Sequence, residues 1–160
     1  ARGVALVPEG RGVFARQTVL ENLKLGAFRV KEQHIIHERL ENLLERLPRL
    51  KERASQLAGT LSGGEQQMLA MARILRTGAK LLLLDEITEG LAPVIVKKLG
   101  EVIRLLKTRG YTILLVEQNF RFAAPLADRH IVLEHGRIVA TVTKEELPSK
   151  TDLLHELLGV

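Results

Sequence analysis

One stretch of the sequence decides the fold class, Leu81-Leu82-Leu83-Leu84-Asp85-Glu86, because a short apolar run ended by two acids is typical of a buried strand. Apolar residues then recur at helical spacing from Ile95 to Leu106, and Gly110 closes that helix. A second apolar and β-branched run covers residues 111–116. A strand, a helix and a strand in this order predict an α/β fold with a parallel sheet and a right-handed crossover.

The remaining elements fit around this unit. The stretch 18–60 contains only helical patterns, which breaks the alternation and predicts a separate helical subdomain. Thr18 and Glu21 have the spacing of a capping box, so a helix is expected from about Val19 to Leu25. The other expected elements are a strand at 4–7, a helical stripe at 36–47 stopped by Pro48, a helix at 65–76, a helical stretch at 119–127 interrupted by Pro125, a hairpin at 131–142 and a final helix at 151–158.

Composition excludes several classes of protein. With 46% apolar and 27% charged residues, the 160-residue chain is globular rather than disordered, and it contains no cysteine for disulfides, thiol catalysis or a cysteine zinc site. No apolar run approaches the roughly 18 residues that a membrane helix needs. The net charge is +5, but the basic residues are scattered among acids, so we expect no nucleic-acid partner. His34 and His37 are three residues apart without a third ligand in view, and a solvated helix face is the favoured interpretation.

The string from Leu61 to Gln67 is the first chemical motif. Ser62 offers a hydroxyl, and Gly63 and Gly64 let a ligand approach backbone N–H groups closely. A helix follows at once, so its N-terminal dipole favours an anion such as phosphate. The bland alternative is a flexible loop that caps a helix, and it would be preferred for a lone Ser-Gly-Gly.

The second motif is the acid pair that ends the leucine run. Carboxylates at the carboxyl end of a buried parallel strand lie where open α/β sheets bind ligands. Asp85 could hold Mg²⁺, and Glu86 could accept a proton from an attacking water. The alternative is a pair of solvated acids. The position 23 residues after Ser62 favours the functional interpretation.

Together these motifs resemble the signature and Walker B sequences of ABC-transporter ATPases. The resemblance covers essentially all 160 residues and is closest to the LivF type, the ATP-binding subunits of branched-chain amino acid importers. The further strings that carry it are Val7–Arg11, Thr18–Leu23, Glu65–Ala70, Gly90–Pro93 and Leu115–Asn119. The resemblance implies a partial P-loop NTPase domain, with a core at 1–11 and 61–160 that ends in a hairpin and helix, and a helical subdomain at about 12–60.

The resemblance also implies roles for individual residues. Glu86 would be the catalytic base, Gln118 would stand at the switch-histidine position, and Asp85 would bind Mg²⁺. Glu9 stands at the Q-loop position, which implies contact with the metal and the attacking water. The nucleotide-binding residues would be Glu9, Ser62, Gly63, Gly64, Glu65 and Gln66. Glu9 and Gln118 replace the usual Gln and His, as is common in the LivF type. Three further positions depart from the general pattern: Ala92 at the D-loop Asp, as in the LivF type, Ile87 in place of Pro, and Glu89 as an added acid.

Cofactors and partners follow from the same resemblance. We expect ATP and Mg²⁺ as cofactors, a second ABC ATPase subunit in a head-to-tail dimer, permease subunits in the membrane and, indirectly, a solute-binding protein. The expected location is peripheral, at the cytoplasmic face of the cell membrane. The solute would be leucine, isoleucine or valine, although similar systems carry urea or amides.

The phosphate-binding sequence Gly-x-x-x-x-Gly-Lys-Ser/Thr does not occur in the chain. We therefore expect it upstream of Ala1, and expect the 160 residues alone to bind ATP poorly and not to hydrolyse it. A non-catalytic truncated remnant is one alternative. A nucleic-acid-associated ABC ATPase is another, but only 51 residues separate Glu9 from Leu61, too few for the long coiled coil of that class.

Overall fold

The computed structural model describes residues 3–28, 40, 44, 45 and 47–158. It divides into two compact units, Ala1–Val116 and Glu117–Val160. His34 and His37 lie outside the described residues, as do Ile36 and Leu43 of the predicted helical stripe. Of the helices that the structure describes, none combines the length and the apolar character needed to cross a bilayer.

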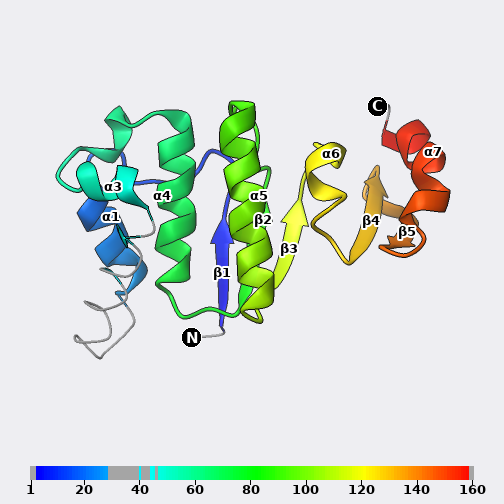
Figure 1. The fold of residues 1–160 in the computed structure, drawn as a ribbon, viewed down its shortest axis with the longest axis horizontal. Coiled ribbons are helices and arrows are strands. Elements are labelled where there is room, and N and C mark those ends of the chain that lie inside the picture. The colour runs from blue at the N-terminus through cyan, green and yellow to red at the C-terminus, as the bar shows by residue number, and fades with distance from the viewer. Residues whose placement is uncertain (1–2, 29–39, 41–43, 46, 159–160) are drawn as a thin grey trace. The chain divides into compact units, whose positions relative to one another are not determined.

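The first unit contains a three-stranded parallel sheet (Figure 1). Its strands are β1 (Val4–Val7), β2 (Leu81–Asp85) and β3 (Thr112–Val116), in the order β1-β2-β3. The register places Leu82 beside Ala5 and Ile113. This pairing confirms the predicted parallel sheet, and β2 is its central strand. Both acids of the second motif therefore lie at the carboxyl end of the central strand.

Two long helices precede and follow the central strand β2 in the sequence. Helix α4 (Gly63–Leu75) precedes β2 and packs against β1, and α5 (Pro93–Thr108) connects β2 to β3 (Figure 1). Pro93 begins α5, where its missing N–H costs no hydrogen bond. The predicted helices at 65–76 and 95–106 are confirmed, with ends displaced by one to two residues. Leu99, Ile103 and Leu106 of α5 are buried, as the helical spacing requires.

The predicted helical stretch packs onto α4. It contains α1 (Val19–Gly26), α3 (Pro48–Glu52) and a short 3₁₀ turn (Ala58–Thr60). The Thr18–Glu21 capping box at the start of α1 is confirmed. One apolar cluster joins the helical stretch to α4, formed by Val19, Leu23, Leu40, Leu50, Ala58, Leu61, Leu69 and Ala72. Pro48, predicted to stop a helix, occupies the first turn of α3, a position that tolerates proline.

The second unit is built on a hairpin. Strands β4 (Arg129–Glu134) and β5 (Arg137–Thr143) pair antiparallel, which confirms the predicted hairpin. His135 and Gly136 both have positive φ, as the tightest hairpin turns require. Helix α6 (Phe120–Ala123) is shorter than predicted, and α7 (Leu147–Leu158) begins four residues earlier than predicted. Val132, Val142 and Leu154 form a buried apolar cluster in this unit.

Candidate functional site

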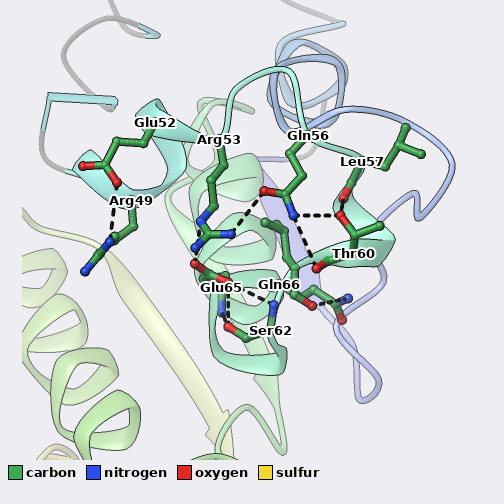
Figure 2. A network of polar contacts seen from close by, with 10 residues as sticks. Arg49, Glu52, Arg53, Gln56, Leu57, Thr60, Ser62, Glu65 and Gln66 are labelled. Carbon is green, nitrogen blue, oxygen red and sulfur yellow. Dashed lines mark hydrogen bonds and ion pairs between the residues drawn. The ribbon is translucent and has the colours of Figure 1, made fainter.

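The first part of the candidate site is the N-terminus of α4. Ser62 is its N-cap, in extended conformation, and forms a complete capping box with Glu65 (Figure 2). The Glu65 Oε2 atom accepts hydrogen bonds from the Ser62 N–H at 2.9 Å and from the Ser62 hydroxyl at 2.7 Å. The Glu65 N–H donates to the Ser62 Oγ at 3.4 Å. In this structure the donors of Ser62 are therefore directed to a carboxylate of the chain itself.

An arginine from the preceding loop completes this arrangement. The Arg53 Nε lies 3.0 Å from Glu65 Oε1, and Arg53 Nη1 donates to Gln56 Oε1 at 3.2 Å (Figure 2). Gln56 Nε2 in turn donates to the Thr60 hydroxyl at 2.8 Å. The hydrogen bond from the Ser62 hydroxyl lowers the pKa of the Glu65 carboxyl, and the Arg53 charge lowers it further. The carboxylate is thus held ionised beside the helix N-terminus, where the dipole also favours it.

The two glycines of the signature string are helical residues. Gly63 and Gly64 form the first turn of α4, and neither has a positive φ. Because glycine has no side chain, these two positions leave space for neighbouring side chains. A Cβ on Gly64 would lie 2.8 Å from Cγ1 of Ile95, and one on Gly63 would lie 2.8 Å from Nη2 of Arg11. The two glycines therefore allow the side chains of Arg11 and Ile95 to pack against the first turn of α4. The sequence analysis did not predict these contacts.

Gln66 is also engaged within the chain. Its Oε1 accepts a hydrogen bond from Arg11 Nη1 at 3.1 Å. Its Nε2 donates to the carbonyl oxygens of Ala58 at 3.1 Å and Leu61 at 3.2 Å. The amide of Gln66 thus connects three segments around the signature string, and its predicted contact with nucleotide stays a prediction.

The second part of the candidate site is the turn after β2. Asp85 ends the strand, and Glu86 follows with φ of 44°, a left-handed conformation that is uncommon for a residue with a side chain. The Glu86 N–H donates to the Val116 carbonyl at 2.9 Å, which ties the turn to β3. Ile87 is 1% exposed and anchors the turn in the core. Such strained residues are concentrated at functional sites.

Three carboxylates converge at this turn. One oxygen each of Glu9, Glu86 and Glu89 lies within 4.8 Å of the others. Glu9 follows β1 and Glu86 follows β2, so adjacent parallel strands deliver these two to the same sheet edge. Carboxylate oxygens are the ligands that Mg²⁺ prefers, so this donor set fits the expected metal. Asp85, predicted to bind Mg²⁺, is not a member of this cluster.

Gln118, the second predicted catalytic residue, belongs to the second unit. It follows the end of β3 by two residues, is exposed, and accepts a hydrogen bond on its backbone carbonyl from the Phe120 N–H at 2.9 Å. Its catalytic role stays a prediction.

Three residues have places at the site that the sequence analysis did not assign. Glu89 was noted only as an added acid, although its position three residues after Glu86 was a signal that the two could share a turn. Arg11 lies between Gly10 and Gly12, which signals a tight turn but not where the side chain goes. Arg53 carries no local signal, because its contact with Glu65 depends on the packing of α3 against α4.

Comparison with known proteins places these motifs in context. Residues 1–89 match the family model of the ABC transporter family. The chain is 49% identical over 158 residues to the high-affinity branched-chain amino acid transport ATP-binding protein BraG of Pseudomonas aeruginosa. It is 43% identical over 150 residues to the probable branched-chain amino acid transport ATP-binding protein LivF of Archaeoglobus fulgidus. The aligned regions cover 99% and 91% of this chain, and 67% and 61% of those proteins.

Solved structures agree with the sequence relatives. An ATP-binding subunit of an ABC transporter superposes with a TM-score of 0.82 at 27% identity, over 99% of this chain and 69% of that one. The ATP-binding cassette MJ1267 of an ABC transporter gives 0.81 at 25% identity, over 98% and 67%. The parallel sheet, the signature helix and the acids after β2 thus occur in a chain that belongs to the ABC transporter family.

Proposed function

We propose that this chain is part of an ATP-binding subunit that energises the import of branched-chain amino acids. The observation that carries the proposal is the convergence of Glu9, Glu86 and Glu89 at the end of the central strand. This cluster of three carboxylates occurs in a chain that is 49% identical to a branched-chain amino acid transport ATP-binding protein. The chain spans about two thirds of its relatives, so activity, solute and partners are all part of the proposal.

The acidic cluster would serve the hydrolytic step. Mg²⁺, when bound with ATP, would neutralise phosphate charge. Glu9 and Glu89 would supply oxygen ligands or hold a water of the metal, with Asp85 adding a ligand directly or through water. Glu86 would accept the proton of the attacking water, because its carboxylate lies in this cluster at the carboxyl end of β2. A catalytic role for Gln118 in hydrolysis is proposed only from the resemblance, in which this residue stands at the switch-histidine position.

The signature string would serve the other nucleotide of a head-to-tail dimer. Ser62, Gly63 and Gly64 would face the terminal phosphate bound by the second subunit, with Glu65 and Gln66 behind them. The N-terminal end of α4 favours such an anion. For the Ser62 hydroxyl to donate to phosphate, it must give up its 2.7 Å hydrogen bond to Glu65. Arg53 then remains as the partner that keeps Glu65 ionised.

The helical stretch offers a surface for a permease subunit. A groove of about 450 Å³ lies between α1 and α3, with Thr18, Glu21, Lys24, Lys51 and Glu52 among its lining residues. We propose that a short helix of the membrane subunit binds here, which would place the chain at the cytoplasmic face of the membrane. A solute-binding protein would be an indirect partner, and nucleic acid would not be one. Charge reversal at Lys24, which lines the groove, and at Arg16, an exposed residue two positions before the N-cap of α1, would then weaken co-purification with the permease.

A transport assay tests the proposal directly. In cells that lack the subunit to which this chain belongs, return of that whole subunit with the permease subunits and the second ATP-binding subunit should restore energy-dependent uptake of labelled leucine, whereas its Glu86→Gln form should not. Uptake of urea or acetamide in place of leucine would reassign the solute. Uptake that is independent of the chain would support a non-catalytic remnant, and ATPase activity stimulated by DNA would support the nucleic-acid alternative.

A further inference from the structure

Arg11 ends one of the strings that carry the family resemblance, but neither the resemblance nor the proposed function gives it a role. It lies in a run of three left-handed residues, with φ of 75° at Gly10, 70° at Arg11 and 58° at Gly12. Glycine adopts this conformation without a steric penalty, but arginine does not. The turn is closed by hydrogen bonds from the Arg11 N–H to the Pro8 carbonyl at 3.2 Å and from the Gly12 N–H to the Gly10 carbonyl at 2.8 Å. Contacts of the arginine side chain must therefore offset its backbone strain.

Those contacts are with the first turn of α4. The guanidinium lies against Gly63, close enough that a Cβ there would be 2.8 Å from Nη2 and 3.0 Å from Cζ. Nη1 donates to Gln66 Oε1 at 3.1 Å. Arg11 is only two residues beyond Glu9, so a single side chain connects the segment that carries Glu9 to the signature string.

The hydrogen bond from Arg11 also fixes how Gln66 acts on the loop. Because the Gln66 oxygen faces the guanidinium, its Nε2 faces the carbonyls of Ala58 and Leu61. These carbonyls belong to the segment that leads into Ser62. The chain of contacts therefore runs from Arg11 through Gln66 to the backbone just before the cap.

The charge of Arg11 lies beside the N-terminus of α4 and has no carboxylate partner among the described residues. A cation beside the N-terminus of a helix opposes the helix dipole. The arrangement thus carries an electrostatic cost, and in return the positive charge strengthens the hydrogen bond that Arg11 donates to Gln66.

We propose that Arg11 is a positioning residue for ATP turnover, holding the Glu9 segment and the signature string in a fixed relation through Gly63 and Gln66. This inference rests on the proposed function for its effect on turnover. Arg11 touches neither nucleotide nor metal in this role. It acts through Gln66, and its loss would loosen the loop that contacts the nucleotide of the second subunit.

The first test uses the whole subunit to which the chain belongs and does not depend on ATP. Hydrogen exchange of residues 58–67 is compared for the wild type, Arg11→Ala and Arg104→Ala, an exposed arginine on α5 that serves as the matched control. Losing a charged hydrogen bond should speed exchange in this segment about tenfold or more in Arg11→Ala. Exchange as slow as in Arg104→Ala would overturn the inference.

The second test measures ATP turnover in the assembled transporter. Arg11→Ala should raise the KM for ATP about fivefold with kcat little changed, because a loosened loop weakens ground-state and transition-state binding alike. Arg11→Lys should restore most of the KM, since an ammonium can still donate to Gln66. The combined Arg11→Ala and Gln66→Leu variant should be no worse than the poorer single variant.

Two outcomes of the turnover test would overturn the inference: losses that add in the double variant, or a KM for Arg11→Ala equal to that of Arg104→Ala. If the wild-type assembly hydrolyses no ATP, the proposed function fails instead. The exchange measurement still decides whether Arg11 positions the loop.

Discussion

The N-terminus of α4 and the turn after β2 place acids in opposite environments. At the first, the single carboxylate of Glu65 receives two hydrogen bonds from Ser62 and an ion pair from Arg53. At the second, Glu9, Glu86 and Glu89 converge within 4.8 Å, and no described lysine or arginine forms an ion pair with Glu9 or Glu89. At the N-terminus of α4, groups of the chain itself compensate the carboxylate charge. At the turn after β2, the three carboxylates form a concentration of negative charge that a divalent cation would stabilise.

The largest expected effect is at the acidic turn. Glu86→Gln should reduce ATP turnover in the assembled transporter about 100-fold or more while ATP binding persists, because the amide cannot accept the proton of water. Steady-state hydrolysis and nucleotide binding would be measured together. Glu101→Gln, an exposed acid on α5, is the control and should retain full turnover. Turnover of Glu86→Gln within tenfold of wild type would assign the proton-accepting role to another carboxylate.

At the N-terminus of α4, the next effect comes from packing. Gly64→Ala should reduce the free energy of unfolding by about 1–3 kcal/mol, because its Cβ would lie 2.8 Å from Cγ1 of Ile95. Thermal and denaturant unfolding of the chain would measure it. The Gly64→Ala, Ile95→Ala double variant should lose less than the sum of the two single losses. Strict additivity would show that Ile95 does not set the space at Gly64.

A smaller effect distinguishes the capping box of α4 from that of α1. Ser62→Ala and Thr18→Ala should each reduce the free energy of unfolding by about 1 kcal/mol, since both remove the same kind of cap. Only Ser62→Ala should also weaken ATP turnover in the assembled transporter. Equal losses of turnover in both variants would mean that Ser62 acts through helix stability alone.

The smallest effect concerns pH. The pKa of Glu65 is lowered in the folded state, chiefly by the Ser62 hydroxyl, so its contribution to stability is present above its unfolded pKa of about 4.3 and is lost as the pH falls through the lower folded value. The difference in unfolding free energy between wild type and Glu65→Gln should therefore shrink from pH 6 to pH 3. Urea unfolding across that range measures it, with Glu101→Gln as control. A difference that is constant with pH would contradict the assignment.

Local patterns predicted much of the fold. The leucine run ended by Asp85 predicted β2, and apolar residues at helical intervals predicted α4 to within two residues. Helix starts without such signals were predicted less well. Helix α7 begins four residues before the predicted start, and α3 begins at a proline that was expected to end a helix. Helix ends depend on which turn the neighbouring elements bury, and that is a tertiary effect.

The candidate site shows the same division. Ser62 and Glu86 were proposed from motifs at a helix start and a strand end, whereas Glu9 was proposed from the family resemblance. The meeting of Glu89 with Glu9 was not predicted, and neither was the contact of Arg11 with Gly63. Each joins residues more than 50 positions apart, and the pairing of β1 with β2 or the packing of α4 brings them together.

The sequence by itself determined the parallel sheet, the two acids at the end of its central strand and the cap of α4. These features follow from burial, alternation and local hydrogen bonding within a few residues. Only the tertiary structure decided that Gly63 lies against Arg11 and Gly64 against Ile95, and that Glu65 forms an ion pair with Arg53. It also decided that Glu89, rather than Asp85, lies in the carboxylate cluster with Glu9. The physical reason is that side-chain contacts of this kind depend on distances between elements, which strand register and helix packing set and which no local pattern contains.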